Sequence, residues 1–175
     1  MLTLSEPRII ERGPYKVVGV YCAYAGDDEG PGWTGAETGF FRRRDEVKDR
    51  ADDFVLGFLY RPHKDHPDVL ESVKACFIGA EVSAFDHVPD GMSTTQFSGG
   101  RYVIVECRGD VQEEVAAGVG EAIGILAQWI PAHGYVEGDA CFSCGDEKAA
   151  RPPFVEYVHI KIEKPSNGWI TDRNH

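Results

Sequence analysis

Residues 13–18 (GPYKVV) and residues 100–105 (GRYVIV) share the pattern Gly-x-Tyr-x-[Val/Ile]-Val. Each segment opens a stretch of β-branched and aromatic residues, which favours a strand, and each strand leads toward a segment with helical character. The order of the predicted elements also recurs, which indicates an internal duplication. We therefore predict an α+β fold of two βαββ halves with pseudo-twofold symmetry, each with one main helix over an antiparallel sheet. Together the halves bury faces that neither could bury alone.

Alternation of apolar residues and β-branched content predict the strands. They span residues 15–24, 54–60, 77–84, 92–97, 102–107 and 155–163. In the last strand, alternation places Glu156 on the same face as Val158 and Ile160, and Tyr157 and His159 on the opposite face. A carboxylate therefore stands at the head of an apolar face that must point toward the core.

Two helices are predicted, over residues 36–50 and 111–130. In the second helix, apolar residues recur at every third or fourth position, and Asp110 is the expected N-cap. Three glycines within this helix weaken it unless they serve close packing onto a sheet, which is the role that we expect for them. They are Gly118, Gly120 and Gly124.

The composition limits the class of protein. The 175 residues correspond to about one domain, and the formal net charge of −11 excludes nucleic acid as a direct partner, since such a surface repels phosphate. We see no apolar run of the length needed for a membrane span or a signal peptide, so no membrane partner is expected. The five cysteines, an odd number, are expected as reduced thiols, and the predicted location is cytoplasmic.

Four short motifs follow one another in a characteristic order along the chain. They are residues 79–82 (GAEV), 88–92 (VPDGM), 99–103 (GGRYV) and 129–135 (WIPAHGY). This series resembles the GyrI-like small-molecule-binding family, also called the AraC-type effector-binding domain, over residues 7–164. The resemblance implies one effector-binding domain over residues 1–164, with a ligand pocket between the duplicated halves, followed by a polar tail over residues 165–175.

The resemblance also implies a function. Members of the family occur as effector domains of bacterial transcription activators and as stand-alone proteins, and the length of this chain favours a stand-alone member. Some stand-alone relatives bind multidrug-like compounds, some act on DNA gyrase, and some hydrolyse reactive cyclopropane-containing natural products. We expect a protein that sequesters or senses a hydrophobic or cationic small molecule. A hydrolase with a pocket carboxylate and a modulator of DNA gyrase are the alternatives.

The family often carries its pocket carboxylate in a Phe-Glu-x-Tyr motif before the last strand. The nearest match by order begins at Phe142, so Ser143 stands where the glutamate would be. A second alignment uses residues 154–157 (FVEY), where Glu156 falls one place late. Both alignments remain open at this point.

Glu156 is the leading candidate for a pocket carboxylate that binds a cation or, as a general base, activates water. Burying a carboxylate on an apolar face is costly unless it is paired, and the alternative is a strand-end residue that reaches solvent. Glu81 and Glu106 also alternate with apolar or aromatic residues, so either could be the acidic group instead.

Aromatic residues on the strands are candidates for the walls of the pocket, because aromatic rings bind flat and cationic molecules. Core packing is their alternative role. The candidates are Tyr21, Phe58, Tyr60, Phe77, Tyr102 and Phe142. Trp33 joins them from residues 25–35, a glycine-rich and acidic segment that we predict to be a loop.

No cofactor or metal is predicted. Cys141 and Cys144 form a single Cys-x-x-Cys pair without the second pair that a zinc site needs, and they fall in a segment predicted as a loop. The sequence also has no phosphate-binding glycine loop and no dinucleotide fingerprint.

Overall fold

The computed structural model describes residues 1–25, 29–60, 73–146 and 151–165. The described strands are β1 (Thr3–Leu4), β2 (Arg8–Arg12), β3 (Tyr15–Ala25), β4 (Phe54–Tyr60), β5 (Val73–Val82), β6 (Ser93–Phe97), β7 (Gly100–Gly109), β8 (Val136–Asp146) and β9 (Phe154–Glu163). The described helices are α1 (Glu29–Arg43), a short 3-10 turn (Arg44–Glu46) and α2 (Gln112–Ala132). The predicted tail, apart from its first residue, lies outside the described residues.

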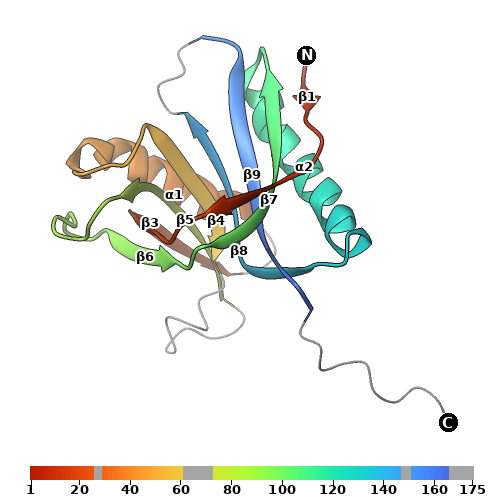
Figure 1. The fold of residues 1–175 in the computed structure, drawn as a ribbon. Helices are drawn as coiled ribbons and strands as arrows, with labels where there is room; N and C mark the ends of the chain where they lie inside the picture. Colours follow the sequence, from red (N-terminus) through yellow and green to blue (C-terminus); the bar gives the residue numbers. More distant parts are fainter. Residues whose placement is uncertain (26–28, 61–72, 147–150, 166–175) are drawn as a thin grey trace.

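One antiparallel sheet contains all these strands, in the order β1-β7-β9-β8-β4-β5-β3-β6, with β2 also paired to β7 (Figure 1). The order β7-β9-β8 in one half mirrors β3-β5-β4 in the other, and the halves meet where β4 pairs with β8. Each half has the sequence strand, helix, strand, strand. The predicted α+β fold of two βαββ halves is confirmed.

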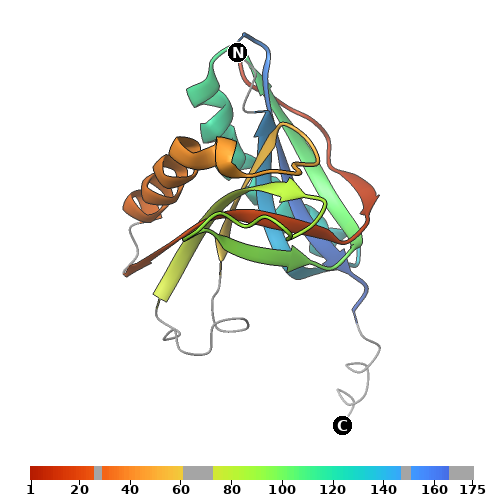
Figure 2. The same ribbon diagram turned by 90° about the vertical axis from the view of Figure 1, so that its left-hand side faces the viewer.

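Both helices cover the same face of the sheet, which we call the helix face (Figure 2). Helix α1 packs on β3 and β5, and α2 packs on β7 and β9. The predicted alternation in β9 is confirmed, because Val158, Ile160 and Ile162 are buried beneath α2.

The opposite face, which we call the inner face, curls around a buried aromatic cluster. Tyr15 of β3 and Tyr102 of β7 come from the two copies of the repeated motif and stand five strands apart, roughly 24 Å on a flat sheet. Both nevertheless contact Phe142 of β8, with ring centroids 5.7 and 5.9 Å away. The repeated motif therefore supplies one tyrosine from each half to the same central ring.

Helix α1 begins at Glu29 and ends at Arg43, so the predicted loop over residues 25–35 and helix over residues 36–50 are wrong in their bounds. Trp33 lies on the helix rather than on a loop. Of the glycines that suggested a loop, Gly35 serves close packing, as does Gly39 farther along the helix: a Cβ atom at either position would lie 3.1 Å from a side chain of β3. Small residues let the helix approach the sheet.

Residues 141–144, predicted as loop, lie on the central strand β8. Their polar and small character hides the strand pattern, but pairing with β9 on one side and β4 on the other holds them in the sheet. Short strands β1 and β2 were also missed, since each pairs with β7, which lies far away in sequence.

Two details of α2 also differ from prediction. Val111 is the N-cap and makes no side-chain capping bond, while Asp110 accepts a hydrogen bond of 3.0 Å from the Met1 amine. Of the three glycines, Gly118 packs against Leu2, but a Cβ at Gly120 or Gly124 would meet nothing within 4 Å. Close packing therefore explains one of these glycines.

By length and composition alone, α2 is apolar enough to cross a membrane, whereas no segment of that kind was expected. In the structure its apolar stripe is buried against β7 and β9, at Val115, Ala122, Leu126 and Ile130. A core helix passes the same test of length and composition, and this packing accounts for the apolar stripe.

Candidate functional site

Two cavities lie on opposite faces of the sheet where the halves meet. On the helix face, a cavity of about 140 Å³ opens between α1 and α2, and we call it the interhelical cavity. On the inner face, a cavity of about 260 Å³ lies between β2 and the central strands, and we call it the inner-face cavity.

Small residues form the floor of the interhelical cavity. Gly57 of β4 stands opposite Ser143 of β8, and Gly145 follows two residues later on the same face. The Trp33 indole of α1 lies directly on Gly57, where a Cβ atom would come 2.5 Å from the ring. The missing side chain at Gly57 is therefore what allows the edge of the Trp33 ring to reach the centre of the sheet.

Glu156 of β9 lines this cavity, as the hypothesis of a pocket carboxylate requires. Its side chain lies beside Gly145, its partner in the β8–β9 pairing, with Cγ 3.7 Å from the position of a Cβ there. Burial raises the pKa of Glu156; a hydrogen bond from the Ser143 hydroxyl opposes this shift, and the charge of Glu37 adds to it. The carboxylate thus lies next to Ser143, the position that the first of the two alignments would give to a glutamate.

The walls of the interhelical cavity are acidic and aromatic. Carboxylates come from Glu37, Asp146 and Glu156, and rings come from Trp33, Phe41 and Phe154. None of the described residues that line the cavity is a lysine or an arginine. Such a cavity favours a molecule that is both hydrophobic and positively charged.

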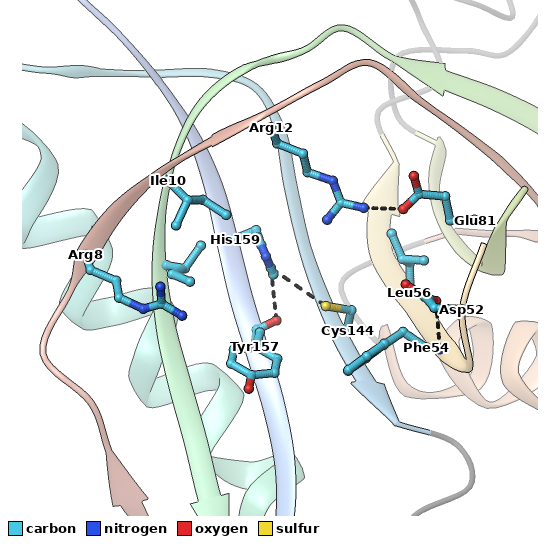
Figure 3. Close-up of a pocket in the computed structure, with 11 residues that line it drawn as sticks. Arg8, Ile10, Arg12, Asp52, Phe54, Leu56, Glu81, Cys144, Tyr157 and His159 are labelled. Carbon is cyan, nitrogen blue, oxygen red and sulfur yellow. Dashed lines mark hydrogen bonds and ion pairs between the residues drawn. The ribbon is translucent and has the colours of Figure 1, made fainter. Parts of the chain in front are cut away.

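The inner-face cavity has a different character (Figure 3). Arg12 of β2 forms an ion pair with Glu81 of β5, and its guanidinium lies 4.2 Å from the centroid of Tyr15. His159 stacks on Phe142, with ring centroids 4.5 Å apart, and Nδ1 lies 3.3 Å from the carbonyl oxygen of Tyr157. Burial and the Arg12 charge lower the pKa of His159 to about 4, so this ring is neutral at pH 7.

Cys144 is not an activated nucleophile. Its Sγ atom lies 3.9 Å from Nδ1 of His159, which is a geometry compatible with a nucleophile and a base. However, burial raises the pKa of the Cys144 thiol to about 12, and the neutral imidazole has no charge to offset that shift. The thiolate form is therefore absent at neutral pH.

The structure separates the predicted site residues into groups. Trp33 and Glu156 meet in the interhelical cavity, and Glu81 lies in the inner-face cavity with Arg12. Glu106 forms an ion pair of 2.7 Å with Arg108. Four aromatic residues pack in or against the inner-face cluster, namely Tyr21, Phe77, Tyr102 and Phe142. The side chains of Phe58 and Tyr60 lie outside the described residues, and a ligand contact by any of these residues stays a prediction.

Among the members of the interhelical cavity that were not predicted are Glu37 and Phe41 of α1. The signal was present, because Trp33, Glu37 and Phe41 follow one another at steps of four, which places them on one face of a helix. The assignment of residues 25–35 to a loop concealed that spacing.

No curated protein sequence matches the chain. Among solved structures, the integron cassette protein VCH_CASS2 from Vibrio cholerae shares 14% identity with a TM-score of 0.58, over 93% of this chain and 99% of that one. SAV2435, solved with bound tetraphenylphosphonium, shares 13% identity with a TM-score of 0.63, over 91% and 94% of the two chains. The C-terminal domain of EcmrR shares 13% identity with a TM-score of 0.60, over 91% and 98%. These likenesses show a common fold.

A family model gives the assignment. The model for Cass2, described as an integron-associated effector binding protein, matches residues 8–162, from β2 to β9. This match covers both halves of the duplication and both cavities, and it confirms the resemblance to GyrI-like effector-binding proteins. The chain therefore belongs to the Cass2 family of integron-associated effector-binding proteins.

Proposed function

We propose that the protein binds a hydrophobic organic cation in the interhelical cavity and thereby sequesters or senses it. The observation that carries this proposal is the position of Glu156, a partly buried carboxylate in a cavity whose described lining residues include no basic side chain. A desolvated carboxylate is costly to keep charged, and a bound cation replaces the hydration that it has lost.

The aromatic wall adds to this preference. Trp33 and Phe41 present ring surfaces from α1, and an organic cation near a ring face gains about 0.5–2 kcal/mol. Membership of an effector-binding family and the tetraphenylphosphonium bound to SAV2435, which has the same fold, support a ligand of this class.

Binding of a larger ligand requires the interhelical cavity to expand. Pockets for drug-sized ligands span roughly 300–1,000 Å³, whereas this cavity holds about 140 Å³. Trp33 lies over Gly57 as a lid on the floor of the cavity, so a rotation of its side chain away from the sheet would open the space beneath it. We propose that Trp33 moves when the ligand enters.

The raised pKa of Glu156 favours hydrolysis as a second candidate function, because a carboxylate with that property can take a proton from water. A reactive cyclopropane-containing compound incubated with the protein would then give a hydrolysed product, and Glu156→Gln would slow its formation by about 100-fold or more. If the compound binds and no hydrolysed product forms, hydrolysis is excluded and binding is the function that remains. A cytoplasmic location and a contact with DNA gyrase stay predictions.

Glu156→Gln should weaken the binding of tetraphenylphosphonium by about 1–3 kcal/mol, because the substitution keeps the size of the side chain and removes the charge. Triphenylphosphine oxide, a neutral molecule of similar shape, should bind equally to both proteins. Isothermal titration calorimetry measures both affinities. Glu163→Gln, at the exposed end of the same strand, is the matched control. Equal affinity of the wild type for the two compounds would contradict the proposed role of charge.

The stability of the protein should also depend on Glu156 and pH. Because burial raises the pKa of this group above its ordinary value of 4.5, the folded state binds the proton more tightly than the unfolded state. The contribution of Glu156 to the free energy of unfolding is therefore fully present below the pKa that this group has in the unfolded state. It is lost as the pH rises through the pKa that the group has in the folded state. Thermal melts from pH 4 to pH 8 should show this loss in the wild type and a smaller one in Glu156→Gln. A variant less stable than the wild type at pH 7 would instead indicate a structural role.

Gly57→Ala should reduce the affinity for tetraphenylphosphonium, because the added methyl group would fill the space on the floor that Trp33 vacates when the ligand enters, and it would also collide with the Trp33 ring in the free protein. Tryptophan fluorescence reports the displaced indole, and calorimetry reports the affinity. Gly120→Ala is the control, since its methyl group meets nothing within 4 Å and should stabilise α2 by about 1 kcal/mol. Unchanged affinity in Gly57→Ala would show that Trp33 does not shape the site.

A further inference from the structure

The inner-face cavity is separate from the interhelical cavity and has its own set of side chains. Alternate residues of β2 form one wall, with Arg8, Ile10 and Arg12 directed toward the central strands (Figure 3). Tyr157 and His159 of β9 form the facing wall. At about 260 Å³ this cavity is the larger of the two, and the sheet itself divides them.

The charges in this cavity are unevenly distributed. Arg12 is neutralised by its ion pair with Glu81, and Asp52 accepts a hydrogen bond of 2.9 Å from the Phe54 amide. Arg8 has no ion-pair or hydrogen-bond partner within the described part of the chain, and it lies at the opposite end of the cavity from Asp52 (Figure 3). Arg8 is exposed at this end of the cavity, which therefore carries a positive charge that no described carboxylate pairs with.

The surface between these two ends is mainly apolar. Ile10, Phe54, Leu56 and Ile104 line it, and the ring of Tyr157 lies below Arg8 (Figure 3). His159 is neutral at pH 7 and adds no charge, so Arg8 is the cation available to a ligand in the described lining.

We propose that the inner-face cavity is a second binding site, for a hydrophobic carboxylate whose anionic group pairs with Arg8 and whose apolar body lies against Ile10, Leu56 and Ile104. Guanidinium and carboxylate match in charge and in planar geometry. The charge preference is opposite to that of the interhelical cavity. This proposal does not depend on the proposed function, because the two cavities use different faces of the sheet.

The test uses 2-naphthoate and its neutral analogue 2-naphthalenemethanol, each titrated into the full chain by calorimetry. Naphthoate should bind more tightly than the alcohol, and Arg8→Gln should remove that difference by weakening naphthoate about tenfold, the effect of losing one charge-assisted contact. Arg101→Gln is the matched control, since Arg101 is an exposed arginine on the neighbouring strand β7 that pairs with Glu11. It should leave naphthoate binding unchanged.

Two further measurements separate this proposal from the proposed function. Tetraphenylphosphonium should bind equally to Arg8→Gln and wild type, and naphthoate should bind equally to Glu156→Gln and wild type. The proposal is overturned if naphthoate does not bind, if it binds no more tightly than the alcohol, if the two arginine variants behave alike, or if tetraphenylphosphonium displaces it. The first three outcomes concern naphthoate alone and do not bear on whether Glu156 binds a cation.

Discussion

Antiparallel pairing of β4 with β8 is the constraint on which the rest of the structure depends. It joins the two halves of the duplication, and its alternation sends Gly57 and Ser143 to the helix face and Leu56 and Cys144 to the inner face. On one face the pair contributes almost no side-chain volume, so a hollow remains between the helices. On the other face the same pair supplies apolar groups to a larger cavity. One pair of strands therefore builds the floors of two sites with different chemistry.

Much of the fold could be predicted from the sequence because its strongest patterns are local. The strand over residues 54–60, the helix ending near Ile130 and the alternation in β9 each carry a clear period. Strand β8 could not be predicted in this way, since Ser143 and Gly145 weaken the pattern and the pairing partners lie far away in sequence. Helix α1 was misplaced for a related reason: Gly35 and Gly39 serve contact with β3, and only tertiary structure reveals that contact.

In the candidate sites, too, residues with a local sequence signal could be predicted, and residues placed by tertiary contacts could not. Glu156 could be identified because a carboxylate at the head of an apolar strand face conflicts with its surroundings, and such conflicts mark functional positions. Its neighbour Ser143 holds the place that one of the two alignments gives to the family glutamate, and in this chain a carboxylate from β9 enters the cavity beside it. Arg8 had no comparable signal, because an arginine on a short edge segment resembles any exposed charge. Its position depends on the pairing of β2 with β7.

The glycines of α2 have a consequence for local unfolding. Gly120 and Gly124 face open space, so nothing in the described packing compensates for the backbone entropy that they lose in a helix. The helix is therefore held mainly by its buried stripe on β7 and β9, and its outer turns are expected to open at a lower free energy than the sheet beneath them. Gln112 and Val115 of this helix line the interhelical cavity. One wall of that cavity is therefore a helix whose sequence has a low intrinsic helix propensity. A ligand that makes contact there would protect the backbone amides of α2 from exchange with solvent, and the free energy of ordering that wall would then form part of its affinity.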